Sequence, residues 1–117
     1  MNLSKQAQEV LSILEEVRTS PLTAKYICET DDDGSWLEMT NICNGHVENV
    51  PQDYVDLMCK LSMTLNGVLI DNRGQHSAIF YELRKAGYSL RTGESDSFGP
   101  LSSVVTIPGT NWKVCYG

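Results

Sequence analysis

The sequence contains no long apolar run, and its first residues do not have the pattern of a signal peptide. None of its hydrophobic stretches approaches the roughly 18 residues that a membrane-spanning helix needs. The first ten residues, MNLSKQAQEV, contain no basic segment followed by an apolar block, so we expect no signal peptide. A composition that is 41% hydrophobic and 21% charged is typical of a globular protein. We therefore expect a single cytoplasmic domain over residues 1–117, with no membrane as a partner.

The sequence also lacks the short motifs of common enzyme classes. It contains no glycine-rich phosphate loop, no GxSxG turn and no HExxH helix. His76 has no nucleophilic partner that the local sequence singles out, and we expect it to lie at the edge of a helix. We therefore expect no catalytic residues, no cofactor and no enzymatic activity.

The four cysteines, Cys28, Cys43, Cys59 and Cys115, form no CxxC pair. Cys43-x-x-His46 has a spacing that suits a metal, with Cys28 and Cys59 as conceivable further ligands. Zinc sites, however, usually contain two closely spaced ligand pairs, and here there is one. Free cysteine is commonly buried, and thiols stay reduced in the cytosol. The pattern favours buried, reduced thiols and no metal site.

Basic residues are scarce and unevenly distributed. The formal net charge of −6 argues against nucleic-acid binding when the chain is taken as a whole. Residues 1–66 contain 11 acidic against 4 basic residues, whereas residues 67–117 contain 4 acidic against 5 basic residues. The two halves therefore differ in electrostatic character.

Hydrophobic periodicity predicts three helices and three C-terminal strands. The predicted helices are 4–18, 52–65 and 73–86, and the predicted strands are 88–93, 101–107 and 111–116. Ser4 is a suitable N-cap for the first helix, and Pro51 fits the first turn of the second. Asp71 or Asn72 is expected to cap the third helix, with Gly87 as its left-handed C-terminal residue.

Residues 24–43 have a different character. The segments AKYICET and SWLEMTNIC are rich in β-forming residues and flank DDDG, whose acids and glycine suit a turn. A β-hairpin is the leading interpretation, and a second helix that starts at 22–24 is the alternative. As a hairpin, the segment would be an acidic insertion between two helices.

These elements predict an α+β fold in which the three helices share one core. Their contact is expected through apolar residues from each helix: Leu14, Val17, Met58, Leu61, Ile79 and Leu83.

The third predicted helix carries a cationic face. Arg73, Ser77, Tyr81 and Arg84 fall on the side opposite its apolar residues, with Lys85 adjacent. Two arginines, a hydroxyl and a phenol can contact phosphates and base edges. The same residues also suit an ordinary solvated helix face.

Two segments of the chain resemble a known family. KQAQEVLSILEEVRTSPLTA, followed by HSAIFYELRKAGYSLRTG, is similar to small winged helix-turn-helix proteins of phages and prophages. In that family a first helix precedes a PLT turn, and a recognition helix ending in LRKAGY leads into the wing. The likeness covers about residues 5–24 and 75–93, and residues 25–70 lie between the two matched segments, where the family has a shorter connection.

The resemblance implies a small DNA-binding regulatory protein of phage or mobile-element type, which reads DNA with helix 73–86. Its candidate DNA-binding residues are Arg73, Gln75, Ser77, Tyr81, Arg84 and Lys85, with Arg91 and Lys113 on the wing. A monomer with so few bases would bind weakly, so a homodimer or a partner protein is implied.

A second interpretation belongs to another functional class. The protein would be an acidic inhibitor or adaptor that binds a host protein without catalysis, through the surface of residues 29–56. Small acidic phage proteins often bind host nucleic-acid enzymes, and here carboxylates would stand in for phosphate charge. The candidate residues are Glu29, Asp31, Asp32, Asp33 and Glu38; an ordinary solubilising loop would have the same composition.

Overall fold

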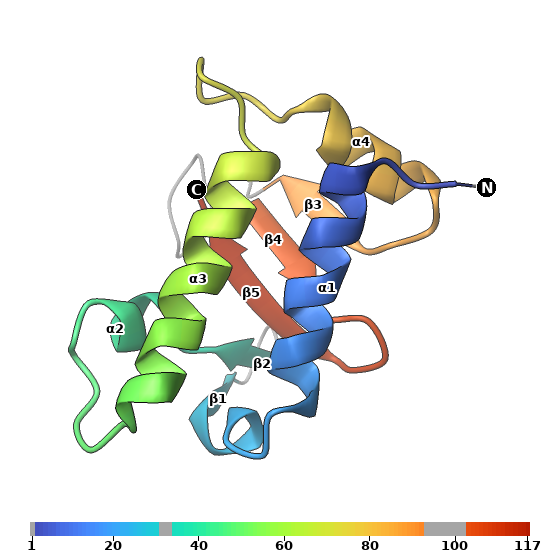
Figure 1. Cartoon of the computed structure of the whole chain (residues 1–117). Helices are drawn as coiled ribbons and strands as arrows, with labels where there is room; N and C mark the ends of the chain where they lie inside the picture. Colours follow the sequence, from blue (N-terminus) through green and yellow to red (C-terminus); the bar gives the residue numbers. More distant parts are fainter. Residues whose placement is uncertain (1, 31–33, 93–102) are drawn as a thin grey trace.

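The computed structural model describes residues 2–30, 34–92 and 103–117 and has a mixed α+β architecture, as predicted (Figure 1). Its helices are α1 (Lys5–Thr19), the 3-10 helix η1 (Thr23–Tyr26), α2 (Met39–Cys43), α3 (Gln52–Val68) and α4 (Ala78–Lys85). Its strands are β1 (Ile27–Thr30), β2 (Gly34–Leu37), β3 (Leu90–Thr92), β4 (Ser103–Thr106) and β5 (Trp112–Tyr116). Among the described helices, none is both long and apolar enough to cross a bilayer.

The strands form one sheet with the order β1-β2-β5-β4-β3. Strand β2 pairs with β5 in parallel, and the other neighbouring strands are antiparallel. The predicted hairpin exists as β1 and β2, but β2 joins it to β5, so it is an edge of the main sheet rather than an insertion. The helix proposed as the alternative at 22–24 is a single 3-10 turn, and residues 39–43, expected in the hairpin, form α2.

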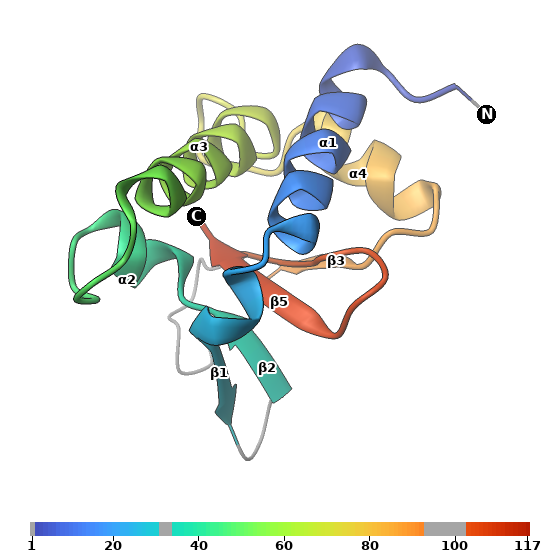
Figure 2. The ribbon, with the colours of Figure 1, turned by 60° about the horizontal axis from the view of Figure 1, so that its bottom comes forward.

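Three helices cover one face of the sheet, with α1 lying between α3 and α4 (Figures 1 and 2). The expected contact between the helices is confirmed. The residues that supply it are Leu14, Val17, Met58, Leu61 and Leu83, which are buried in one core, and Ile79, which is half-buried against it. The same core contains Val105 and Val114 from the sheet, so the helix layer and the sheet are stabilised by one continuous body of apolar contacts.

Local signals explain the two long helices. The Ser4 hydroxyl accepts a hydrogen bond from the Ala7 amide at 3.2 Å, as expected for an N-cap, and α1 ends just before Ser20. Helix α3 begins directly after Pro51 and ends at Val68, three residues beyond its predicted end. Their predicted positions, 4–18 and 52–65, are therefore nearly correct.

Helix α4 begins five residues later than predicted. The Asp71 carboxylate does not cap it; Oδ1 instead accepts hydrogen bonds from the amides of Arg73 (2.8 Å) and Gln75 (3.0 Å) and closes a tight loop. Ser77, the residue before α4, donates its amide to the carbonyl of Leu69, and this bond holds the chain out of a helix until Ala78. The predicted cap at Asp71 or Asn72 is wrong.

The predicted end of α4, at Ala86, is one residue beyond the observed end at Lys85, and the left-handed Gly87 is as predicted. Gly87 has φ +101°, a left-handed conformation that a side chain would disfavour, and its amide donates to the carbonyl of Arg84 at 3.0 Å. This turn sends the chain from α4 directly into β3.

Candidate nucleic-acid interface

The exposed side of α4 carries a cationic and aromatic surface. Tyr81, Arg84 and Lys85 all lie on it, and the Tyr81 side chain is 55% exposed. At about 100° per residue these three positions lie within about 100° of one another; Arg84 borders the buried Phe80, and Tyr81 and Lys85 lie opposite the buried Leu83. We call Tyr81, Arg84 and Lys85 the α4 surface.

Phe80 anchors this surface from beneath. Its ring stacks on the His76 imidazole, with ring centroids 3.9 Å apart and an interplanar angle of 18°. The Tyr81 ring meets it edge-on at 5.1 Å, and the Arg84 guanidinium carbon lies 5.7 Å from its centroid. The exposed tyrosine and arginine are therefore both oriented by one fully buried ring.

The carboxylate of α4 is turned away from this surface and engaged by α1. Glu82 accepts hydrogen bonds from the backbone amide and the hydroxyl of Ser4, each at 2.7 Å. These two bonds lower the pKa of Glu82. Its negative charge thus lies at the N-terminus of α1, where the helix dipole favours it, and leaves the cations of α4 without an acidic partner on their own helix.

His76 lies before α4 rather than at the edge of a longer helix. Its Nε2 is 2.7 Å from the Ser103 hydroxyl oxygen of β4, and Ser103 is only 3% exposed. Burial, and after it the positive charge of Arg84, lowers the pKa of His76, which favours the neutral imidazole. The arrangement ties the start of α4 to the sheet, a contact that no local sequence pattern could predict.

The other residues predicted on this helix occupy different environments. Arg73 and Gln75 are exposed on the loop before α4, where the Arg73 guanidinium is 4.0 Å from the Asp71 carboxylate. Ser77 lies before α4 rather than on its exposed face, and its half-buried hydroxyl donates to the carbonyl of Val68 at 2.6 Å. That bond pairs a carbonyl at the C-terminal end of α3 that would otherwise lack a partner within its helix. It also leaves the Ser77 hydroxyl hydrogen engaged inside the protein rather than directed toward DNA.

Arg91 and Lys113 lie on the opposite face of the sheet from α4. Leu90 is buried in the helix-side core, so its neighbour Arg91 points to the other face and is exposed there. Lys113 aligns with Trp36 across β5 and β2, and its ammonium lies 5.4 Å from the centre of the indole ring. Arg91 and Lys113, predicted on the wing, therefore lie on a different face of the sheet from the α4 cations. Residues 93–101, expected to complete the wing, lie outside the described residues, as does residue 102.

Of the acidic residues named for the alternative function, the structure describes only Glu29 and Glu38. Glu29 is exposed on β1, and Glu38 is half-buried just after β2. Asp31, Asp32 and Asp33 lie outside the described residues. Helix α3 adds the exposed carboxylates of Asp53 and Asp56 to this end of the molecule.

The cysteines differ from expectation. Cys28 is exposed and the other three are half-buried, so the prediction of buried thiols is wrong. In the described part of the chain, no three His, Cys, Asp or Glu side chains lie together as a metal site would require. Cys43 and Cys59, however, lie in contact, although they come from different helices.

A comparison with known proteins found no matching family model, no matching curated protein and no matching solved structure. The α4 surface is therefore the feature from which a function is inferred.

Proposed function

We propose that this protein is a small DNA-binding regulatory protein of the winged helix-turn-helix type found in phages and mobile elements. The observation that carries the proposal is the exposure of Tyr81, Arg84 and Lys85 on one face of α4, with Glu82 withdrawn to α1. Arginine can bind guanine edges in a bidentate manner, lysine pairs with phosphate, and tyrosine can donate to either.

The dimensions of α4 are compatible with this role. An α-helix with its side chains is about 10–12 Å in diameter, which fits the DNA major groove of about 12 Å, and the 8 residues of α4 give it about two turns. Arg73, on the exposed loop before the helix, would reach an adjacent phosphate. Arg91 and Lys113, on the other face of the sheet, take no part in the proposed contact.

Few cations carry the interaction, so the affinity of a monomer would be low. Because these contacts are ionic, the affinity would fall as salt is added, with a slope set by the number of phosphates contacted. A homodimer, or a partner protein on DNA, would present a second set of contacts. Two α4 surfaces spaced by one helical turn of DNA would read a palindromic site.

The test is fluorescence anisotropy with a labelled random-sequence duplex at about 50 mM salt. We expect Arg84→Ala to weaken binding by about 5- to 150-fold, which corresponds to about 1–3 kcal/mol. Arg91→Ala is the matched control, because it removes the same charge from the opposite face of the sheet. If both variants lose affinity equally, the interaction reflects overall charge, and the assignment to α4 is wrong.

A second candidate function is supported by the acidic end of the molecule, where Glu29, Asp53 and Asp56 are exposed. There the protein would bind a basic surface of a host protein as an inhibitor or adaptor. The triple substitution of Asp31, Asp32 and Asp33 to Asn should then abolish capture of that partner and leave DNA affinity nearly unchanged. Arg84→Ala should do the reverse.

A further inference from the structure

Helices α2 and α3 bring two thiols into contact. The sulfur atoms of Cys43 and Cys59 are 2.8 Å apart, although the residues are separated by 16 positions in the sequence. Cys43 is the last residue of α2, and Cys59 lies in the middle of α3. Both side chains are half-buried.

The separation suits a covalent bond better than a metal ion. Two thiolates on a tetrahedral zinc, each about 2.3 Å from the metal, lie about 3.8 Å apart. A disulfide needs about 2.05 Å, so the two sulfur atoms must approach by less than about 1 Å. The described residues also provide no third ligand beside the pair.

We propose that Cys43 and Cys59 form a reversible disulfide by exchange with a low-molecular-weight disulfide such as oxidised glutathione. The proposal is independent of the DNA-binding function, because the pair lies on α2 and α3 rather than on α4. In a reducing cytosol such a bond would be transient and would respond to oxidation.

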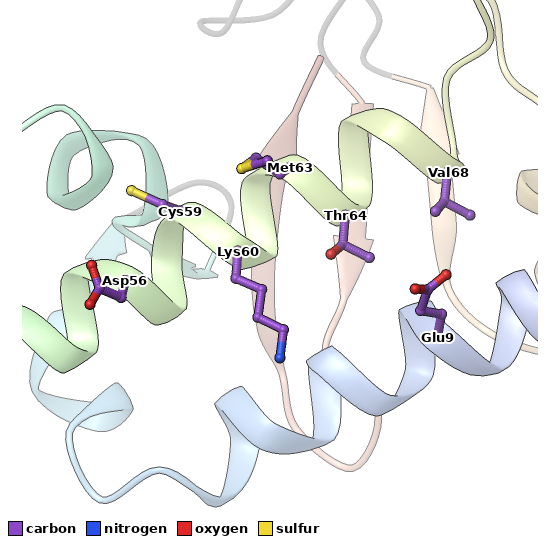
Figure 3. Close-up of a pocket in the computed structure, with 7 residues that line it drawn as sticks. All are labelled: Glu9, Asp56, Cys59, Lys60, Met63, Thr64 and Val68. Carbon is purple, nitrogen blue, oxygen red and sulfur yellow. The ribbon is translucent and has the colours of Figure 1, made fainter.

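A small disulfide can approach the pair from the side of Cys59, whose sulfur touches that of Cys43. Cys59 lines an open cavity of about 450 Å³ on the solvent side of α3, together with Glu9, Asp56, Lys60 and Met63. Figure 3 shows the Cys59 sulfur directed toward α2, whereas the Lys60 chain extends toward α1. The exposure of Met63, at 75%, keeps this side of α3 open to solvent.

The two thiols have different roles in the exchange. The Cys59 thiol is held by Cys43: their contact is the main cause that raises the pKa of Cys59 to about 11, and the Cys59 S–H also points to the Cys43 carbonyl at 3.9 Å. We therefore assign the first attack to Cys43 and the second to Cys59.

The reaction balances in two steps. The Cys43 thiolate attacks one sulfur of oxidised glutathione, forms a mixed disulfide and releases one glutathione thiolate. Cys59 then loses its proton to solvent and attacks the Cys43 sulfur, which releases the second glutathione thiolate. Two protein thiols are oxidised, and one glutathione disulfide is reduced to two molecules of glutathione.

The bond would close the segment from Cys43 to Cys59, which contains two left-handed residues, Gly45 (φ +78°) and Asn49 (φ +62°). Constraining this segment removes freedom from the unfolded chain, so we expect the midpoint of thermal unfolding to rise by roughly 10 °C.

The experiment uses the full chain and its Cys28→Ser/Cys115→Ser variant, in which only the contacting pair remains. After treatment with oxidised glutathione, we expect the variant to lose two hydrogen atoms in intact mass, to remain monomeric and to melt at the higher temperature. Dithiothreitol should reverse all three changes. In Cys59→Ser, by contrast, glutathione should remain attached to Cys43.

Stable glutathione adducts on both Cys43 and Cys59, or a disulfide between two chains, would overturn the proposal. If the double variant does not fold, peptide mapping of the oxidised wild-type chain gives the answer. A peptide linking Cys43 to Cys59 supports the proposal, and any other pairing contradicts it.

Discussion

Helices α3 and α4 both pack on α1, but they differ in how many apolar residues they bury. Helix α3 has 17 residues and buries a full apolar stripe, namely Tyr54, Met58, Leu61 and Leu65. Helix α4 has 8 residues and buries only Phe80 and Leu83. Polar contacts complete its attachment: Glu82 to Ser4 and Ser77 to Val68. A short helix can thus be held firmly when its few apolar residues are supplemented by hydrogen bonds from other elements.

The exposed sides of the two helices also differ in charge. Asp53 and Asp56 are exposed on α3, whose one base, Lys60, lies 3.8 Å from the Glu16 carboxylate of α1. Arg84 and Lys85 are exposed on α4. The two exposed surfaces are thus suited to partners of opposite charge, and the cationic one, on α4, is the one that the proposal assigns to nucleic acid.

The largest effect is expected from the apolar anchor of α4. Phe80→Ala should lower the free energy of unfolding by about 3–5 kcal/mol, because it removes a fully buried ring and leaves a cavity. Tyr81→Ala, the matched change at an exposed ring, should cost no more than about 1 kcal/mol. Urea denaturation measures both values. Equal losses would mean that the two faces of α4 do not differ in burial as described.

A smaller effect is expected from the hydrogen bond that starts α4. Ser77→Ala removes the donor to the Val68 carbonyl, so we expect a loss of about 1–2 kcal/mol in the free energy of unfolding. Ser12→Ala, at an exposed position of α1, is the control and should have little effect. No difference between the two variants would show that Ser77 does not hold the start of α4.

The smallest expected effect is a dependence of stability on pH. Burial, and then Arg84, lowers the pKa of His76 in the folded state, so the unfolded chain takes up the proton first as the pH falls. Stability is therefore full above the unfolded pKa of about 6.5 and declines as the pH falls through it toward the folded-state value.

Thermal unfolding of the wild type and of His76→Gln, between about pH 8 and pH 5, measures this contribution. The variant should lose the decline attributed to His76. If stability falls equally with pH in both proteins, titratable groups other than His76 cause the fall.

Periodicity was sufficient to predict the parts of the fold that are locally encoded. The long apolar stripes of α1 and α3 place these helices within a few residues of their observed bounds. Tyr81, Arg84 and Lys85 were also predicted on one face, because their relation depends only on the helical repeat.

The errors arose where distant parts of the chain meet. The sequence of residues 73–77 has a helical pattern, but the structure there is a loop. Ser77 is held by the carbonyls of Val68 and Leu69, at the end of α3 and its cap, and the local pattern contains no sign of these contacts. The parallel pairing of Ser35 with Trp112 joins segments far apart in sequence, and it makes the hairpin part of the sheet. The alternation of residues along β3 indicates that Arg91 and Leu90 point to opposite faces of the sheet. It does not indicate which of the two faces is covered by the helices.

The central claim, that DNA contacts α4 and not α3, is tested most directly by titrating the ¹⁵N-labelled protein with a DNA duplex at low salt and following its amide signals. The account predicts that the amides of residues 78–86 shift in a dose-dependent way and that the shifts fade as salt is added, while those of residues 52–68 stay in place. Shifts centred on residues 52–68, or no shifts at any DNA concentration, would contradict it.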